Sequence, residues 1–285
     1  MKLRKTFSIF IFLISLVGIS NTSLAYPPQR IVSLAPNITE IIFALGAQDR
    51  LVGVTSYCHW PPEARKIGSV GGFLNPNIEV IIERRPDLVI VTPNGNNKEL
   101  VETLEKLKIQ VLVCPSYNIS QIFDAVEVIG KTLGLQDSAT KIISEMGKQV
   151  KDVEKLVKGA KSAKVAAIVG RRPLIVVGNN EFISDLIKVA GGQNLVSSGK
   201  IRYPHYSYEE LIVAGPDVII DLSVGNEGSD VGCAEAINHW KNFSTIPAIK
   251  NNRVYCLDNS TFLIPGPRAV GSVAELARLL HPEVY

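Results

Sequence analysis

The sequence IEVIIERRPDLVI at residues 78–90 has a counterpart 130 residues later, YEELIVAGPDVII at residues 208–220. Each stretch carries a glutamate (Glu79 or Glu209), then Pro-Asp seven residues on, then an apolar run typical of a buried strand. Each apolar run leads to a Gly-Asn pair, Gly95-Asn96 or Gly225-Asn226, at the same offset. The repeat therefore predicts two similar lobes.

Strand and helix patterns alternate on both sides of this repeat. In the first half we expect strands at 30–34, 51–55, 87–91 and 110–113, with helices at 78–83, 98–107 and between a cap at Asn37 and a stop at Gly46. In the second half we expect strands at 165–169, 174–177, 217–221 and 253–257, with helices at 182–190, 234–240 and 267–280. Such alternation indicates an α/β fold of two Rossmann-like lobes, each with a mainly parallel sheet flanked by helices.

The middle of the chain has a different pattern. From Asp137 to about Lys158, apolar residues recur at helical spacing and charged residues cover the other face. About 22 residues at 1.5 Å each make a rod of roughly 33 Å. We interpret it as a single connecting helix at 135–160 between an N-terminal lobe (26–134) and a C-terminal lobe (161–285). One more surface helix of a single domain is the alternative. A single rigid connector predicts only small lobe rotations.

The first 25 residues have the pattern of a secretory signal. Lys2, Arg4 and Lys5 precede an apolar run at 7–19, and Ser23-Leu24-Ala25 offers a cleavage site. An uncleaved membrane anchor is the alternative. The cleavage site contains no cysteine, so the sequence does not indicate a lipid anchor. Removing residues 1–25 leaves 27 basic and 27 acidic residues. This neutral balance favours neither nucleic acid nor an anionic membrane as a partner.

Four cysteines remain in an exported, oxidising setting: Cys58, Cys114, Cys233 and Cys256. They allow two disulfides in three connectivities. The pair closest in sequence, Cys233 and Cys256, is the favoured one. Four unpaired buried thiols are the alternative.

Ligands of open α/β sheets bind beyond the carboxyl ends of the strands, so two facing lobes predict a cleft there. Its expected lining is 35–37, 57–60, 71–75, 92–96, 201–208, 223–226 and 259–267. These loops hold many aromatic side chains, which suit a large, flat, partly apolar ligand: Tyr57, Trp60, Phe73, Tyr203, Tyr206, Tyr208 and Phe262.

Catalytic motifs are missing from the sequence. It has no Gly-x-Ser-x-Gly, Walker A, His-Glu-x-x-His or early Gly-x-Gly-x-x-Gly motif. Cys58-His59 lacks the spaced partners of a zinc site, although His59 and His205 both fall in expected cleft loops. We therefore expect a binding protein without a catalytic site or a resident metal or cofactor.

Several motifs resemble those of the helical-backbone solute-binding proteins of ABC importers. They are RIVSLAPNITE at 30–40, YCHWPPEA at 57–64, NPNIE at 75–79, PDLVI at 86–90, DLIKVAGG at 185–192 and Pro267-Arg268. The resemblance covers essentially the whole mature chain, and the cobalamin-binding branch is the most similar one. It implies a periplasmic, monomeric protein, not an enzyme, with a small-molecule ligand as cargo and a permease with its ATPase as partner.

The resemblance also implies roles for single residues. Tyr57, Trp60, Phe73, Tyr203 and Phe262 match or lie near positions that contact the corrin, and Arg268 adjoins a ligand-contacting loop. Tyr206 joins this set as a further cleft aromatic. Glu79 and Glu209 match the two glutamates that dock onto arginines of the permease, although helix N-terminal carboxylates that complement the dipole are the plainer interpretation.

The sequence departs from the cobalamin-binding pattern at two places. Thr92 stands where that branch carries a tryptophan, and Ser260-Thr261 replaces an Asp-Trp step. Ferric-siderophore or haem binding on the same fold is the nearest alternative, and for a siderophore only Lys200, Arg202 and Arg268 offer cleft cations. A periplasmic enzyme and a sensor subunit without transport are the alternatives from other classes.

Overall fold

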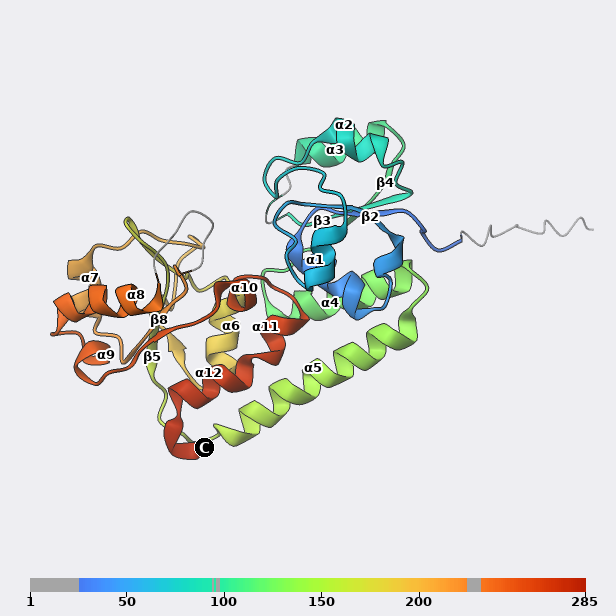
Figure 1. Ribbon diagram of the computed structural model, residues 1–285. Helices are drawn as coiled ribbons and strands as arrows, with labels where there is room; N and C mark the ends of the chain where they lie inside the picture. Colours follow the sequence, from blue (N-terminus) through green and yellow to red (C-terminus); the bar gives the residue numbers. More distant parts are fainter. Residues whose placement is uncertain (1–25, 94, 96–97, 225–231) are drawn as a thin grey trace, which may run out of the picture.

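The computed structural model describes residues 26–93, 95, 98–224 and 232–285, and shows two α/β lobes side by side (Figure 1). The predicted signal peptide (1–25) and the repeat's Asn96, Gly225 and Asn226 lie outside the described residues. Each lobe contains its own sheet of mainly parallel strands. The predicted fold class is therefore confirmed.

The first sheet is fully parallel, in the order β2-β1-β3-β4. Its strands are β1 (Ile31–Ser33), β2 (Leu51–Val54), β3 (Leu88–Val91) and β4 (Gln110–Val113). The helices of this lobe are α1 (Pro36–Ala44), α2 (Ile78–Glu83), α3 (Lys98–Lys106) and α4 (Ile119–Thr132), with 3₁₀ turns at Gln48–Arg50 and Pro62–Lys66.

The second sheet follows the same plan with one antiparallel addition. The parallel strands β5 (Lys164–Arg171), β8 (Val218–Asp221) and β9 (Val254–Cys256) lie side by side, β7 (Gln193–Asn194) pairs parallel with β5, and β6 (Leu174–Val176) pairs antiparallel with it. The helices are α6 (Phe182–Val189), α7 (Tyr208–Ala214), α8 (Cys233–Trp240), α9 (Pro247–Lys250), α10 (Asn259–Phe262), α11 (Pro267–Gly271) and α12 (Val273–Leu280), with 3₁₀ turns at Lys241–Phe243 and Pro282–Val284.

The sequence repeat corresponds to one structural unit in each lobe, the short helix and strand α2–β3 and α7–β8. The aspartate before each strand ties it to the start of its neighbour. Asp87 accepts hydrogen bonds from the amides of Gln29 (2.7 Å) and Arg30 (3.0 Å), which precede β1. Asp217 accepts one from the amide of Lys164 (2.9 Å), which begins β5. The Pro-Asp pair thus sets the register of two parallel strands in both halves.

The two lobes share one hydrophobic core. Successive residues of a strand face opposite sides of a sheet. On the first sheet, Val32 and Val89 pack under α2 and α3, whereas Ile31 and Leu88 face the other side, toward the shared core. The inward cluster is continuous with inward residues of the second sheet, such as Val165 and Val218, and with the apolar faces of α5 and α12. Because side chains of both lobes fill this core, large lobe movements would disrupt it.

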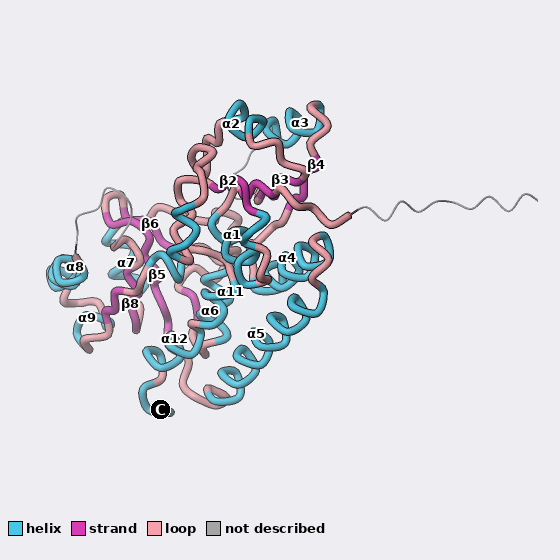
Figure 2. Tube along the Cα trace, turned by 45° about the vertical axis from the view of Figure 1, so that its right-hand side comes forward, coloured by secondary structure: helices cyan, strands magenta, loops and turns pink. Residues whose placement is uncertain are grey.

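The connecting helix α5 (Gln136–Leu156) has 21 residues and a length of roughly 32 Å. Figures 1 and 2 show it running beneath both lobes, from the end of α4 to the start of the second sheet. It packs against α4 on one side and against α11 and α12 on the other. The helix is thus a strut packed against both lobes.

Some predicted details were wrong. Helix α1 begins at Pro36 with Ala35 at the N-cap, and Asn37 is buried inside the first turn instead of capping it. The predicted helix 267–280 is two helices separated at Ser272, whose hydroxyl donates to the Ala269 carbonyl (2.8 Å). Phe262 lies in α10 and not in a loop. Helix α4 was not predicted.

A candidate ligand cleft between the lobes

A cavity of about 470 Å³ lies between the lobes, within the usual size range of ligand pockets. One wall comes from the N-terminal lobe, where chain segments leave the carboxyl ends of β1 to β4: Pro36, Asn37, Tyr57, His59, Phe73, Thr92 and Ser116. The other wall comes from the C-terminal lobe: Glu181, Phe182, Arg202, Tyr203, Asn259, Ser260, Leu263, Ile264 and Pro265. The strand-end rule therefore located the cleft.

The N-terminal wall presents rings held by close backbone packing. The Phe73 ring lies directly against Gly95, because a Cβ on that glycine would come within 2.1 Å of the ring. Tyr57 is 45% exposed. In the same wall the buried Asn37 amide donates to the Ser116 hydroxyl (3.2 Å), which joins the start of α1 to the segment after β4. This wall thus presents both rings and polar groups to the cavity.

The C-terminal wall contains a compact charged cluster around Glu181, which is 2% exposed. The Arg202 guanidinium donates to one Glu181 oxygen and the Tyr203 hydroxyl donates to the other (2.9 Å). Burial and the Glu181 charge raise the pKa of Tyr203, so it remains a neutral phenol. Arg202 also stacks over the ring of Tyr117 from the N-terminal lobe, 4.2 Å from its centre. Arg202 is therefore neutralised within the protein.

A glycine makes this cluster possible. A Cβ on Gly178 would come within 2.3 Å of the Ile201 carbonyl oxygen, so the segment that carries Arg202 and Tyr203 can approach only a residue without a side chain. The Gly178 amide donates to the Arg202 carbonyl (2.7 Å), and the Val176 amide to the Pro204 carbonyl (3.0 Å). The end of β6 thus fixes the position of Arg202.

A polar recess of about 530 Å³ adjoins the cavity and shares Glu181 and Arg202 with it. Four amide side chains dominate its lining, which also includes Tyr117, Asp185 and Lys200: Asn118, Gln121, Asn179 and Asn180. Residues of both lobes contribute. The cleft therefore combines an apolar cavity rich in rings with an adjoining recess rich in amides.

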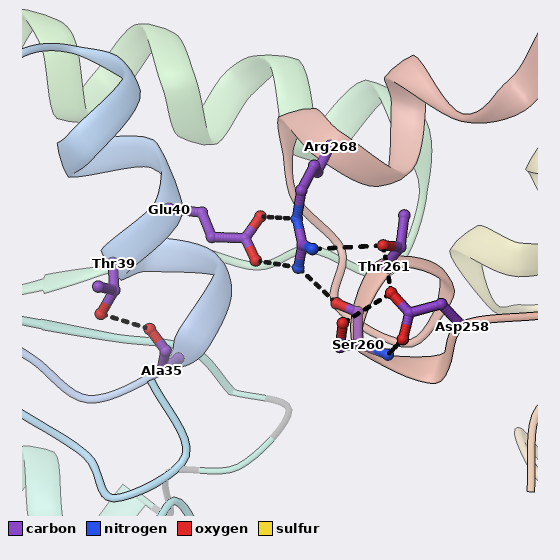
Figure 3. Close-up of polar contacts among 7 residues, drawn as sticks. All are labelled: Ala35, Thr39, Glu40, Asp258, Ser260, Thr261 and Arg268. Atoms are coloured by element: carbon purple, nitrogen blue, oxygen red, sulfur yellow. Dashed lines mark hydrogen bonds and ion pairs between the residues drawn. The ribbon is translucent and has the colours of Figure 1, made fainter. Parts of the chain in front are cut away.

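An ion pair joins the lobes beside the cavity (Figure 3). Glu40 on α1 is buried, and its two oxygens accept from Arg268 on α11 at 2.7 and 3.4 Å. Arg268 also donates to the Ser260 carbonyl (2.5 Å) and the Thr261 hydroxyl (3.3 Å). Burial raises the pKa of Glu40, although Arg268 opposes that shift. The pair thus holds α1 against α11 and fixes the cavity-lining α10.

The structure places the sequence-predicted residues in different settings. Tyr57, Phe73 and Tyr203 line the cavity. Trp60 and Arg268 do not line it but stack on each other at its edge, 4.6 Å from ring centre to guanidinium carbon. Tyr206 packs on the outer core of the second sheet, and Phe262 is 3% exposed within the shared core.

The residues that sequence reasoning missed are Ser116, Glu181 and Phe182. Ser116 follows β4, so the strand-end rule could have located it. Glu181 is the N-cap of α6 and Phe182 is its first residue. They follow β6, which runs antiparallel to β5, so the rule for the carboxyl ends of parallel strands does not cover them. The neighbouring Asn118 caps α4 by accepting from the Gln121 amide (2.8 Å), a capping pattern that was overlooked.

The described residues contain no group of three or more His, Cys, Asp or Glu side chains arranged to hold a metal ion. His59 lines the cavity, whereas His205 forms an isolated bridge with Ile175. No helix in the described part of the chain is long and apolar enough to cross a membrane.

Comparison with known families identifies the architecture. Residues 31–261 match the family model described as periplasmic binding protein. The chain belongs to this family. It is therefore a substrate-binding protein of the kind that serves ABC transporters, and not an enzyme.

Individual relatives place the chain within the family. An uncharacterized ABC transporter substrate-binding lipoprotein, YvrC of Bacillus subtilis, is 28% identical over 90% of this chain and 82% of its own length. The crystal structure of the periplasmic vitamin B12 binding protein BtuF of Vibrio cholerae superposes with a TM-score of 0.80 at 25% identity, covering 90% of this chain and 98% of that one. The haem-binding protein RhuT of Roseiflexus sp. RS-1 has the same fold, with a TM-score of 0.79 at 24% identity, covering 90% and 99%.

Proposed function

We propose that this protein captures cobalamin or a related corrinoid in the cleft between its lobes and delivers it to the permease of an ABC importer. The observation that carries the proposal is the pairing of a ring-lined cavity with an amide-rich recess. A corrinoid has matching parts, because its macrocycle is broad and flat and its edge carries amide side chains. The similarity to vitamin B12-binding proteins supports the same ligand class.

The charges around the cavity support an uncharged ligand. Among the described residues that line the cavity itself, Arg202 is the one cation and Glu181 the one anion, and they pair with each other. The adjoining recess adds one residue of each charge, Lys200 and Asp185. Arg268 is likewise held by Glu40. An anionic ligand would have to compete with a buried carboxylate for either guanidinium, and an unpaired buried charge is costly. Cyanocobalamin carries no net charge and needs no such competition.

The recess supports recognition of amides. Asn118, Gln121, Asn179 and Asn180 supply both N–H donors and C=O acceptors, the groups that pair with a primary amide. Tyr57 and Phe73 supply ring surface on the other side of the cleft. We expect the corrin face to contact Tyr57 and Phe73 and its amide side chains to enter the recess.

Equilibrium dialysis tests this assignment. Residues 26–285 are dialysed against cyanocobalamin, haemin and a ferric tris-hydroxamate in parallel. Cyanocobalamin should be retained, and Tyr57→Ala and Phe73→Ala should each weaken its binding roughly tenfold because each removes one ring contact. Leu107→Ala serves as the control, because Leu107 is exposed and lies in the turn after α3, outside the residues that line the cleft. Retention of haemin or the hydroxamate in place of cyanocobalamin would reject the corrinoid assignment.

Haem is the second candidate ligand. The fold of RhuT and the presence of the His59 imidazole in the cavity favour it. Haem propionates, however, are anionic, and the described lining offers them the already paired Arg202 in the cavity and Lys200 in the adjoining recess. A visible spectrum of a haemin complex that changes on His59→Ala would support haem and contradict the corrinoid proposal.

For delivery, we propose Glu79 and Glu209 as the docking groups. They occupy equivalent positions in the repeat, each as the second residue of an exposed short helix, α2 or α7. One helical turn later each helix carries an exposed isoleucine, Ile82 (42%) or Ile212 (37%). Figure 1 shows both helices on the sides of their lobes away from α5. Matched carboxylate and aliphatic groups suit a permease that contacts both lobes alike.

Charge reversal tests the docking role. Glu79→Lys with Glu209→Lys should leave ligand binding unchanged and abolish uptake into cells. Glu83→Lys, on the same helix as Glu79 and also exposed, is the matched control and should retain uptake. Normal uptake by the double variant would rule out both glutamates as docking groups.

Export completes the proposal. Residues 1–25 have the pattern of a signal peptide, with cleavage after about Ala25. The mature chain should then begin near Tyr26 in the periplasm, as an N-terminal sequence of the exported protein would establish.

A further inference from the structure

We propose that Cys233 and Cys256 form a disulfide in the exported protein, which fastens α8 to the strand that leads into the cleft wall. The inference needs export to an oxidising compartment but is independent of the ligand. In the structure all four cysteines are reduced. Cys233 and Cys256 are nonetheless in contact, whereas Cys58 and Cys114 are buried in the core.

The two sulfur atoms lie at a junction of secondary-structure elements. Cys233 is the first residue of α8, and Cys256 is the last residue of β9. The Cys256 thiol lies 3.5 Å from the Cys233 carbonyl oxygen and also hydrogen-bonds to the Cys233 thiol. Helix α8 packs on β9. The two thiols therefore lie within reach of each other.

The remaining thiols have other surroundings. The Cys58 sulfur accepts a hydrogen bond from the Thr39 hydroxyl (3.1 Å) and contacts the Thr55 hydroxyl (3.2 Å). Burial raises the pKa of Cys58, and it raises the pKa of both Cys114 and Cys256 to about 12, so exposure and not pKa separates the two pairs. Cys58 and Cys114 are buried and shielded from an oxidising partner, whereas Cys233 is exposed.

The chemistry is a thiol–disulfide exchange with a donor disulfide of the thiol oxidoreductase class. The exposed Cys233 thiolate attacks the donor disulfide, forms a mixed disulfide and releases the first donor thiol. Cys256 then loses its proton and attacks the Cys233 sulfur, which releases the second donor thiol. Two thiols are oxidised to one disulfide, and the donor disulfide is reduced to two thiols.

The bond would act on the ligand cleft through the segment after β9. Asp258 follows Cys256 closely and caps α10, whose residues Asn259 and Ser260 line the cavity. The other end of α8 is already anchored, because the buried Trp240 indole donates to Asp221 of β8 (2.8 Å). A disulfide at Cys233 fixes the end of α8 that lacks a side-chain cap.

Counting free thiols tests the proposal. The exported mature protein is unfolded without reductant and alkylated with iodoacetamide, and its mass is then measured by mass spectrometry. Two of the four cysteines should carry a label. The mass should also be two hydrogens lower than that of a chain with two labels and two free thiols. Peptide mapping should recover one cross-linked species that joins Cys233 to Cys256. A Cys233→Ser/Cys256→Ser variant should also take two labels, without the mass loss.

A second arm separates geometry from export. Protein made under reducing conditions is incubated with glutathione disulfide, and should form the same cross-link. Reductant should then lower the urea midpoint of the wild type but not of the double serine variant. Four labels in the exported protein, or a cross-link through Cys58 or Cys114, would overturn the proposal. If the cross-link forms with glutathione disulfide but not in the exported protein, the assumed export to an oxidising compartment is contradicted. If it forms in neither experiment, the proposed contact between the two thiols is contradicted.

Discussion

Removing Glu40 should loosen the contact between the lobes, because its partner Arg268 comes from the other lobe. Breaking a fully buried ion pair costs about 3 to 5 kcal/mol, and an exposed pair contributes less than about 1 kcal/mol. The Glu40 side chain is 4% exposed and that of Arg268 is 23% exposed. Arg268 also keeps its bonds to Ser260 and Thr261. We therefore expect Glu40→Ala to lower the free energy of unfolding by about 2 to 3 kcal/mol.

The change is measurable by urea and thermal unfolding. For a chain of this size the loss corresponds to a fall in Tm of roughly 4 to 12 °C. Glu127→Ala, an exposed glutamate on α4, should stay within about 0.5 kcal/mol of the wild type.

A double-mutant cycle isolates the pair. If Glu40 and Arg268 stabilise the protein through each other, the loss in Glu40→Ala/Arg268→Ala should be smaller than the sum of the two single losses by more than about 1 kcal/mol. Additivity of the single losses within about 0.5 kcal/mol would refute the reasoning.

Three further predictions concern the C-terminal lobe and the lobe arrangement. Partial burial raises the pKa of Asp258, but hydrogen bonds from Thr261 and Ser260 and the charge of Arg268 outweigh it and hold the pKa below its usual 3.8. The ionised Asp258 therefore stabilises the folded protein above pH 3.8, and this stabilisation is lost as the pH falls through the lower pKa of the folded state. Asp258→Ala should therefore cost about 1 kcal/mol at pH 6, in urea unfolding, and a difference that persists unchanged well below pH 3.8 would contradict this role. Reduction of the Cys233–Cys256 bond should cost about 3 kcal/mol by the chain-entropy estimate, and equal urea midpoints with and without reductant would contradict it. The shared core and α5 predict small lobe rotations on ligand binding, and a large drop in the radius of gyration by X-ray scattering would refute that.

Much of the fold could be predicted because its signals are local. Glu79 and Glu209, with their Pro-Asp partners, mark the same helix–strand unit twice, and the hydrogen bonds of Asp87 and Asp217 explain why that dipeptide recurs. The strand-end rule found Tyr57, Phe73 and Tyr203 because parallel strands deliver their loops to one edge.

The rest of the site depends on contacts between distant residues. Glu40 and Arg268 are 228 positions apart, so no local pattern indicated that this arginine would be neutralised. Trp60 was expected in the cleft but stacks on the same arginine. Phe262 was expected in a loop, but the short helix α10, capped by Asp258, includes it and buries its ring. Such outcomes follow from how the lobes pack, which the sequence pattern does not specify.

The cleft is proposed to bind an uncharged corrinoid. Calorimetric titration of purified residues 26–285 with cyanocobalamin tests this proposal most directly. We predict one ligand per protein with a Kd below about 1 μM, which corresponds to a binding free energy of about −8 kcal/mol or better. The absence of binding heat with cyanocobalamin, together with tight one-to-one binding of haemin or a ferric siderophore, would contradict the claim.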